Sequence, residues 1–360
     1  MNDRWQDRAF PVRTGEELER ERLATYLRQQ WPDLEGDLEI SQFPHGYSNL
    51  TYLLHVGRDE FVLRRPPFGA NVRGGHDMAR EYTILHQLVD VYPRVPRPLH
   101  YCADESILGA PFYLMERLQG VILRPQMPGE MAPAPSLMGQ IAASTISNLA
   151  VLHAVDYEAA GLDQLGRPRG YVDRQIAGWT RRYHHAQTHD LAAMERTATW
   201  LAEHLPPEQD AALIHNDYKY DNLILDPADW SRIIGVLDWE MATIGDPFMD
   251  LGTCLGYWTQ PDDPPEIQAL QLSPTTLPGN PTRTEVVQAY VAASGRDVSD
   301  VLFYYVYGLF KVAVIVQQIY ARYRQGHTSD PRFEGLDQAV RACGHMAQQA
   351  IRHQRIDRLG

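Results

Sequence analysis

The chain has 360 residues, of which 44% are hydrophobic and 22% charged, a composition typical of globular proteins. Its formal net charge of −13 argues against a general nucleic-acid binder, which would present a basic face. Residues 303–316 form the richest apolar run, but Lys311 interrupts it, so we expect no membrane-spanning segment. The length suggests two domains or one large two-lobed unit.

The start of the chain and the cysteines both favour a cytoplasmic protein. Four charged residues stand within the first eight, and no apolar stretch typical of a secretion signal accompanies them. Cys102, Cys254 and Cys343 are far apart and odd in number. This spacing fits neither a disulfide framework nor a zinc site, so we expect three buried apolar fillers.

The first third of the sequence predicts a small antiparallel sheet with a helix against it. The opening helix should cover residues 16–31, with a capping box formed by Thr14 and Glu17. Apolar alternation and turn residues give the remaining elements of this region. They are strands at 38–43, 50–56 and 60–64, a helix at 76–90, and strands at 97–102 and 111–116.

After residue 136 the sequence has mainly helical periodicity. Helices are predicted at 137–153, 172–187, 190–204, 282–294, 299–324 and 336–352. Short β-like runs at 212–215, 223–225 and 233–237 interrupt this pattern. The fold class is therefore α+β, with an N-terminal lobe over 1–118 and a helical C-terminal lobe over 119–360. Ligands commonly bind in a cleft between two such lobes.

The most polar segment lies between these β-like runs. Residues 215–222 read His-Asn-Asp-Tyr-Lys-Tyr-Asp-Asn. The spacing of Asp217 and Asn222 allows a carboxylate to face a substrate hydroxyl while an amide oxygen turns toward a cation. Asp238 follows the apolar run 233–237, as a side chain at a strand end would. Mg²⁺ is suited to such a site because it takes one or two protein oxygens and leaves the rest to phosphates and water.

Taken in order, these motifs resemble the aminoglycoside phosphotransferase and choline kinase family, relatives of the protein kinases. The strings HNDYKYDN, LDWE at 237–240 and GDPFMDLG at 245–252 are similar to its catalytic and metal-binding motifs. The subgroup associated with acyl-CoA dehydrogenases is the most similar. The resemblance implies a protein-kinase-like two-lobed fold, with ATP and Mg²⁺ as cofactors. Four upstream strings support it: FPHGYSNLTYLL at 43–54, FVLRRPP at 61–67, REYTILHQL at 80–88 and FYLMERLQG at 112–120.

The resemblance assigns the nucleotide-binding residues. Gly46, Ser48 and Asn49 would form a phosphate-covering turn, although a single glycine is also compatible with a plain β-hairpin. A cation from the third strand would grip phosphates and pair with Glu81. The other nucleotide-binding residues lie at the hinge between the lobes. Met115 would sit behind adenine, and the backbone of Glu116 and Leu118 would contact it.

The cation is an arginine here, not the lysine of protein kinases. Strand alternation places Val62 and Arg64 on one face, and the string FVLR resembles the family's strand that ends at its cation, so we prefer Arg64 to Arg65. A guanidinium can clamp phosphate oxygens in bidentate fashion. The alternative is an exposed surface arginine.

The remaining roles follow from the same resemblance. Asp217 would orient and deprotonate the acceptor hydroxyl, with Lys219 near the transferred group, and Asn222 and Asp238 would hold Mg²⁺. His215 and Asp250 are interpreted as scaffold. Because D-F-G, A-P-E and an activation segment are missing from the sequence, the acceptor should be a small molecule with a hydroxyl group.

The acceptor pocket is expected in the helical lobe. Lys311, Gln318 and Arg322 share one helical face beside Tyr307, which would suit a carboxylate, phosphate or acyl thioester. A buried core helix with snorkelling cations is the alternative. The resemblance to the acyl-CoA-dehydrogenase-associated subgroup implies a hydroxy acid or hydroxyacyl acceptor. A cationic acceptor such as choline or an aminoglycoside, and a nucleotide-binding regulator without transferase activity, remain open.

Overall fold

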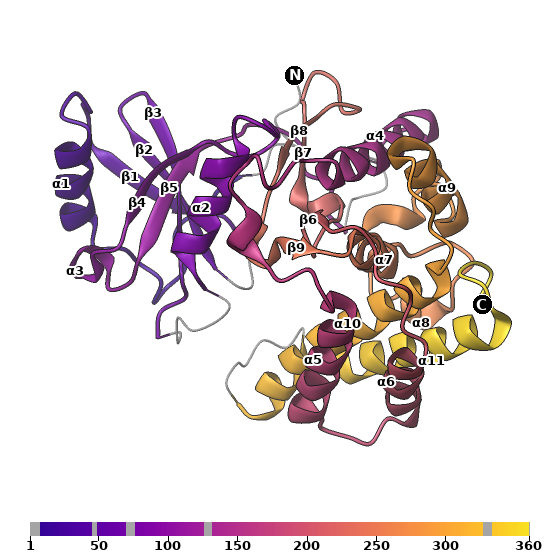
Figure 1. Ribbon diagram of the computed structural model, residues 1–360. Helices are drawn as coiled ribbons and strands as arrows, with labels where there is room; N and C mark the ends of the chain where they lie inside the picture. Colours follow the sequence, from indigo (N-terminus) through magenta and orange to yellow (C-terminus); the bar gives the residue numbers. More distant parts are fainter. Residues whose placement is uncertain (1–7, 45–48, 70–75, 126–131, 327–332, 360) are drawn as a thin grey trace. The chain divides into compact units, whose positions relative to one another are not determined.

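The computed structural model describes residues 8–44, 49–69, 76–125, 132–326 and 333–359. The chain divides into two compact units (Figure 1). Unit 1 comprises Met1–Ile122 and Leu223–Met241, and unit 2 comprises Leu123–Asn222 and Ala242–Gly360.

Unit 1 contains a five-stranded antiparallel sheet with the order β1-β2-β3-β5-β4. Two helices of 11 residues, α1 and α2, accompany the sheet together with the short α3. All strands and helices predicted for this region are present. Their bounds are α1 Arg20–Gln30, β1 Leu38–Gln42, β2 Leu50–Val56, β3 Asp59–Arg65, α2 Met78–Leu88, β4 Pro98–Cys102, α3 Glu105–Leu108 and β5 Phe112–Glu116.

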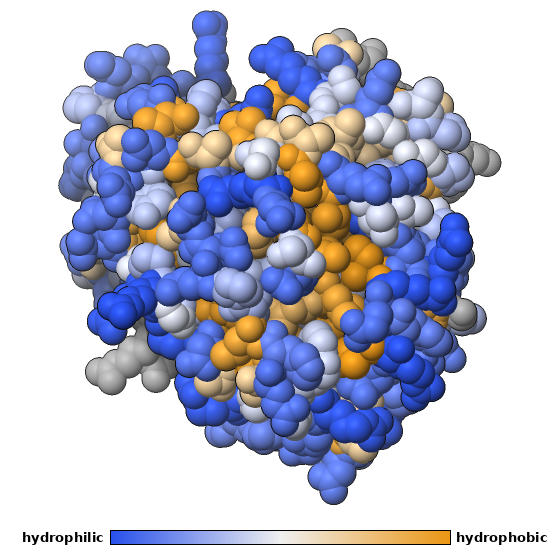
Figure 2. All heavy atoms as spheres, turned by 45° about the vertical axis from the view of Figure 1, so that its right-hand side comes forward, coloured by the Kyte–Doolittle hydropathy of each residue, from blue (hydrophilic) through white to orange (hydrophobic). Residues whose placement is uncertain are grey.

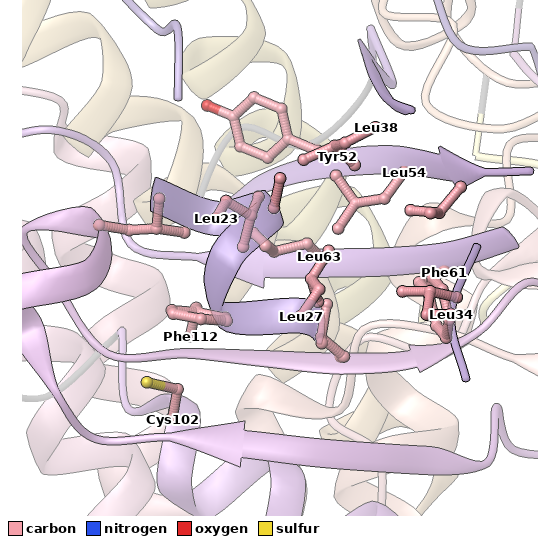
Figure 3. Packing of buried hydrophobic residues seen from close by; sticks show 14 of the residues in the cluster. Leu23, Leu27, Leu34, Leu38, Tyr52, Leu54, Phe61, Leu63, Cys102 and Phe112 are labelled. Atoms are coloured by element: carbon pink, nitrogen blue, oxygen red, sulfur yellow. The ribbon is translucent and has the colours of Figure 1, made fainter. Parts of the chain in front are cut away.

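Alternation along the strands gives the sheet two different faces. Leu23 and Leu27 of α1 lie next to Leu63 of β3 in the apolar cluster on one face (Figure 3). Tyr52 and Phe112 belong to the same cluster. Burying side chains of this size stabilises the unit by roughly 1.5–3 kcal/mol each. The helix α2 contacts β4 and β5.

The predicted capping box is wrong. The first helix begins at Arg20, after Glu19, and no side chain caps it. The carboxylate of Glu17 instead accepts a hydrogen bond from the backbone N–H of Gly15 at 2.7 Å, within the preceding turn. The local motif therefore stabilises a turn, and the helix starts where Leu23 and Leu27 can reach the core.

A segment from later in the chain completes unit 1. Strands β7 (Leu223–Leu225) and β8 (Ile233–Val236) pair with each other, and Val121 bridges to Leu225. The N–H of Val236 also donates to the carbonyl of Arg94 at 2.7 Å. The first part of unit 1 thus ends at Ile122, and residues 223–241, predicted from the sequence to lie in the C-terminal lobe, belong to this unit.

Unit 2 is mainly helical, as predicted, with a two-stranded sheet formed by β6 and β9. The short strand β9 and the helices α7 and α8 were not predicted with bounds. Its elements are α4 Pro135–His153, α5 Tyr171–Ala186, α6 Ala192–Glu203, β6 Ala212–Ile214, β9 Thr243–Gly245, α7 Pro247–Tyr257, α8 Pro265–Gln268, α9 Arg283–Ser294, α10 Val301–Arg324 and α11 Leu336–His353. Short 3-10 turns lie at Asp163–Leu165, Tyr220–Asn222, Trp239–Met241 and Pro274–Thr276.

Glycines allow α7 and α10 to pack backbone against backbone. A Cβ atom at Gly256 would lie 2.6 Å from the carbonyl carbon of Gly308, and one at Gly308 would collide with the carbonyl of Gly252. No Cβ atom tolerates such distances, so only glycine permits this crossing. The crossing brings the middle of α10 against Thr253 of α7 and fixes the position of Lys311.

Helix α10 is long and apolar enough to cross a membrane, but 72% of its most apolar window is buried inside the protein. It is therefore the core helix of unit 2, but Lys311 is 1% exposed and does not snorkel to the surface as the alternative interpretation expected. On the face shown in Figure 2, hydrophilic side chains cover much of the surface and hydrophobic ones form patches rather than a continuous belt. The three cysteines are free and buried, as predicted.

Candidate active site

Asp250 of α7 fixes the loop after β6 through hydrogen bonds to its backbone. The two carboxylate oxygens of Asp250 accept hydrogen bonds from the backbone N–H groups of His215 and Asn216, both at 2.7 Å. His153 of α4 lies 3.2 Å from the same carboxylate. Burial alone would raise the pKa of Asp250, but the hydrogen bonds and charges of His153 and His215 together outweigh it, and the pKa is lowered. His215 and Asp250 thus have the scaffold contacts expected of them.

Asn216 stands directly before Asp217 and adopts a left-handed backbone conformation with φ 66°. Its side-chain amide donates to the hydroxyl of Tyr171 at 3.2 Å. Its carbonyl accepts from the ammonium of Lys311 at 2.5 Å. Elements far apart in sequence therefore fix a conformation that costs non-glycine residues free energy.

Asp217 lies at the centre of a polar cluster in unit 2. Its Oδ2 accepts from Nζ of Lys219 at 2.7 Å and from the amide of Asn222 at 3.0 Å. The same amide donates to the backbone carbonyl of Asp217 at 2.8 Å. Burial would lower the pKa of Lys219, but the adjacent Asp217 carboxylate raises it well above its ordinary value, so the cation is retained.

Two further residues of this cluster were not singled out from the sequence. The ammonium of Lys219 lies 4.7 Å from the ring centre of Tyr257. Burial raises the pKa of Asp221, although the charge of Lys219 opposes this shift. Its Oδ1 has no hydrogen-bond partner among the described residues. Asp221 stands inside the motif HNDYKYDN, so the sequence could have identified it as a candidate site residue. Tyr257 stands in no such motif, so the sequence offered no reason to select it.

In unit 1, Arg64 joins three carboxylates. Its guanidinium lies 3.4 Å from Glu81 of α2, 2.9 Å from Asp238 and 3.9 Å from Glu240. The side chain is 10% exposed, and burial alone would lower its pKa, but the charges of Glu81 and the other nearby acidic groups together outweigh burial and raise the pKa well above its ordinary value. The predicted pairing of Arg64 with Glu81 is present.

Arg65 lies on the opposite face of β3. Its guanidinium donates to the carbonyls of Pro66 and Leu108 and stacks 3.8 Å above the ring of Phe68. Alternation along the strand therefore gives the two arginines different partners, and only Arg64 lies beside Glu81 and Asp238.

Asn49 is fixed at both ends of its amide. Its nitrogen donates to Glu240 at 2.6 Å, and its oxygen lies 2.9 Å from Nδ1 of His76. Gly46 and Ser48, the other residues assigned to the phosphate turn, lie outside the described residues. Glu240 was missed as an individual residue, although it stands in the LDWE motif.

The predicted hinge follows β5. Met115 is 5% exposed, whereas Glu116 and Leu118 are half-buried. The N–H of Glu116 already donates to the carbonyl of Arg97 at 2.9 Å, and its side chain accepts from the N–H of Arg97. Their contact with adenine stays a prediction.

The four residues proposed for the acceptor lie in different environments. Tyr307 and Lys311 are buried, with exposures of 0% and 1%, whereas Gln318 and Arg322 are exposed. Lys311 binds the catalytic loop and lies 3.4 Å from the hydroxyl of Thr253. Its partner 95 positions away could not be found from helical spacing.

The two predicted magnesium ligands belong to different units, Asn222 to unit 2 and Asp238 to unit 1. The amide nitrogen of Asn222 is engaged by Asp217, which directs its oxygen elsewhere. Asp238 has φ 69° and accepts from Arg64. Among the described residues, no group of three or more His, Cys, Asp or Glu side chains could hold a metal. Oxygen donors of this kind fit Mg²⁺, whose remaining ligands are phosphates and water.

Comparisons with known proteins identify the family of the chain. Residues 39–285 match the model of the phosphotransferase enzyme family. Acyl-CoA dehydrogenase family member 10 of Mus musculus is 36% identical over 323 residues, which are 89% of this chain and 30% of that protein. The chain thus spans about a third of the length of this relative.

Solved structures show the same fold. A protein from Ralstonia eutropha assigned to the aminoglycoside phosphotransferases is 29% identical, with a TM-score of 0.78 over 94% of this chain and 99% of that one. Spectinomycin phosphotransferase, in complex with ADP and spectinomycin, is 12% identical, with a TM-score of 0.58 over 90% and 98%. The matched family model covers more than half of the chain, and the catalytic-loop residues lie within it. The chain therefore belongs to the phosphotransferase enzyme family and has a protein-kinase-like fold.

Proposed function

We propose that the protein transfers the γ-phosphoryl group of ATP to the hydroxyl group of a small molecule. The observation that carries this proposal is the environment of Asp217. Its carboxylate is held by Lys219 and Asn222, on a loop whose amides bind Asp250. A carboxylate fixed in this way can orient a hydroxyl and accept its proton.

The reaction is an in-line displacement. The acceptor oxygen forms a bond to the γ-phosphorus while the bond between that phosphorus and the β,γ-bridging oxygen breaks. The hydroxyl proton passes to Asp217, and ADP leaves with the bonding electron pair. Lys219 stays charged because of its ion pair, so it can neutralise negative charge near the transferred group.

Binding of the nucleotide is proposed for unit 1. Arg64 would grip phosphate oxygens, and Glu81 would orient its guanidinium. Asn49 and the hinge residues Met115, Glu116 and Leu118 would cover phosphates and adenine. Mg²⁺, held by Asn222 and Asp238, would supply charge neutralisation at the phosphates.

For the acceptor we propose a hydroxy acid or a hydroxyacyl thioester. The similarity to part of a protein named as an acyl-CoA dehydrogenase supports this class. A protein that joins a phosphotransferase to such an enzyme would let both parts act on acyl thioesters. The exposed amide of Gln318 and the exposed guanidinium of Arg322 would contact the acceptor directly. Lys311 would act through its bond to the loop, and Tyr307 is buried in the helix.

The test is ADP release with ATP and Mg²⁺ against a panel of acceptors. The panel comprises 2-, 3- and 4-hydroxy acids, their CoA thioesters, choline and an aminoglycoside. Phosphorus NMR identifies the phosphorylated product. Asp217→Asn should lower kcat by roughly 10²- to 10⁴-fold, the usual contribution of a general base.

Asp297→Asn provides a matched control, because it neutralises an exposed carboxylate of the same unit. Phosphorylation of only choline or the aminoglycoside would replace the acyl acceptor by a cationic one. ATP binding without turnover of any acceptor would favour the regulator. The paired Asp217, Lys219 and Asn222 argue against that alternative, since a binding protein has no need of a held base.

A further inference from the structure

The exposed side of α5 is basic in an otherwise acidic chain. Residues 167–185 carry five arginines and one carboxylate, Asp173, although the whole protein has a net charge of −13. Arg174 is satisfied internally, because its guanidinium donates to the backbone carbonyls of Arg167 and Arg169. Arg167 and Arg169 precede the helix, so Arg181 and Arg182 are the remaining arginines of α5, and both are exposed.

The two guanidinium groups converge on Gly178, one turn earlier in the helix. A Cβ atom at Gly178 would lie 3.8 Å from Nη1 of Arg182 and 4.0 Å from Nη2 of Arg181, with no other non-neighbouring group within 4 Å. Long side chains of a helix lean toward its N-terminus, over positions three and four residues back. The missing side chain of Gly178 therefore leaves a notch with a guanidinium on two sides.

This arrangement is destabilising in two respects, and among the described residues the contact of Arg182 with the ring of Trp179 offsets only part of that. A glycine in the middle of a helix is less stable than alanine by roughly 1 kcal/mol. Like charges that face the same point repel each other. Among the described residues no carboxylate forms an ion pair with Arg181 or Arg182. A bound anion would remove the repulsion, and paired guanidinium groups match phosphate oxygens.

The notch is linked to the catalytic loop by successive contacts within unit 2. The guanidinium of Arg182 lies 4.5 Å from the ring centre of Trp179, which is 5% exposed. The ammonium of Lys311 lies 5.6 Å from the same ring and binds the carbonyl of Asn216. Arg182, Trp179 and Lys311 thus connect the notch with the residue that precedes Asp217.

We propose that Gly178, Arg181 and Arg182 form a binding site for phosphate groups on the carrier of the acceptor, namely those of coenzyme A. This inference rests on the proposed hydroxyacyl thioester acceptor and deepens it. The site holds the carrier end of the substrate, and Asp217 acts on the hydroxyl at the other end. Arg181 and Arg182 contribute binding and take no part in proton transfer.

Calorimetry with CoA and with pantetheine, which lacks the phosphates, tests the site directly. Saturating ADP and Mg²⁺ keep CoA from the nucleotide site. The wild-type protein should bind CoA at least roughly 10-fold more tightly than pantetheine, as expected for charge-assisted hydrogen bonds. Arg181→Gln/Arg182→Gln should remove this preference. Arg232→Gln/Arg352→Gln deletes two exposed charges elsewhere and should keep it.

Gly178→Leu provides a second variant that fills the notch and favours the helix, so that a loss of CoA binding cannot be attributed to unfolding. For a hydroxyacyl-CoA that the wild-type enzyme phosphorylates, both variants should raise the KM of this substrate roughly 10-fold and leave kcat unchanged. Equal affinity of the wild-type protein for CoA and pantetheine overturns the site. Turnover of hydroxyacyl-CoA with an unchanged KM in both variants also overturns it, while the proposed function stands. CoA binding that depends on Arg181 and Arg182, without turnover of any thioester, supports the binding site but contradicts the proposal that a hydroxyacyl thioester is the acceptor.

Discussion

The ammonium of Lys311 donates a hydrogen bond of 2.5 Å to the backbone carbonyl of Asn216. Lys311 is 1% exposed, and no carboxylate among the described residues forms an ion pair with it. Burial lowers its pKa to about 8, although the charges of Asp217 and Asp250 oppose this shift. The bond fixes the residue that precedes the proposed base, so Lys311 is a positioning residue.

Lys311→Met should therefore lower kcat more than it changes the KM for ATP. The methionine fills the same volume but leaves the Asn216 carbonyl without its donor, and the base loses its orientation. We expect a loss of roughly 10- to 100-fold, the effect of a charged hydrogen bond. Lys311→Arg should recover part of the rate. Equal kcat values for wild type and Lys311→Met, measured by ADP release, would contradict the positioning role.

The same lysine predicts a pH dependence of stability. Its pKa is about 8 in the folded state against an ordinary 10.5, so the unfolded chain holds more protons between these values. The free energy of unfolding of the wild type, relative to Lys311→Met, should then rise between pH 8 and pH 10.5 and be flat below pH 7. The rise should be roughly 1–3 kcal/mol. Urea unfolding of both proteins at pH 7 and pH 10 measures it, and a fall over this range would be inconsistent with a buried ammonium.

Regular elements could be predicted because their signals are local. The alternation in 50–56 and the periodicity of 283–294 gave bounds within a residue or two of β2 and α9. The start of α1 was misplaced, because the motif at Thr14 is equally suited to a turn. Short strands such as β9 have too few residues to show a period.

The candidate site was predictable only where its residues stand in one motif. Asp217, Lys219 and Asn222 meet because five residues of loop connect them. The contact of Lys311 with Asn216 depends on glycines that let α7 and α10 approach, and no pattern in α10 alone encodes this. Helical spacing placed Lys311 on its helix but could not show that the loop before Asp217 lies against it.

Arg64 and Arg65 form a natural pair for testing the nucleotide site. Arg64→Gln removes the guanidinium that is proposed to grip the phosphates and that Glu81 and Asp238 hold in place. The Kd for ATP should therefore rise roughly 10- to 100-fold. Arg65→Gln removes bonds to Pro66 and to Leu108 on the other face, so it should lower the melting temperature and leave this Kd unchanged. Titration of ATP with Mg²⁺ distinguishes them. Equal effects on ATP binding would show that neither face is specific.

Asp250→Asn should damage both stability and rate. An asparagine presents one acceptor and one donor, so one of the two loop amides, at His215 or Asn216, would face an N–H group. A buried group left unpaired costs about 3 kcal/mol. The lowered pKa of Asp250 makes its contribution fully present above the ordinary carboxyl pKa and lost as the pH falls through the folded value. Acid unfolding of Asp250→Asn should therefore be less steep than that of wild type.

Gly308→Ala tests the crossing of α7 and α10, on which the position of Lys311 depends. The new methyl group would collide with the carbonyl of Gly252, and neither backbone can move without disturbing the other helix. Overpacking of this kind costs roughly 1–3 kcal/mol, so the midpoint of thermal unfolding should fall by several degrees. Gly335→Ala is the control, because a Cβ there meets nothing within 4 Å. Because the crossing holds Lys311 against Asn216, kcat of Gly308→Ala should also fall at temperatures where the variant is fully folded. An unchanged kcat of the folded variant would show that the crossing affects stability alone.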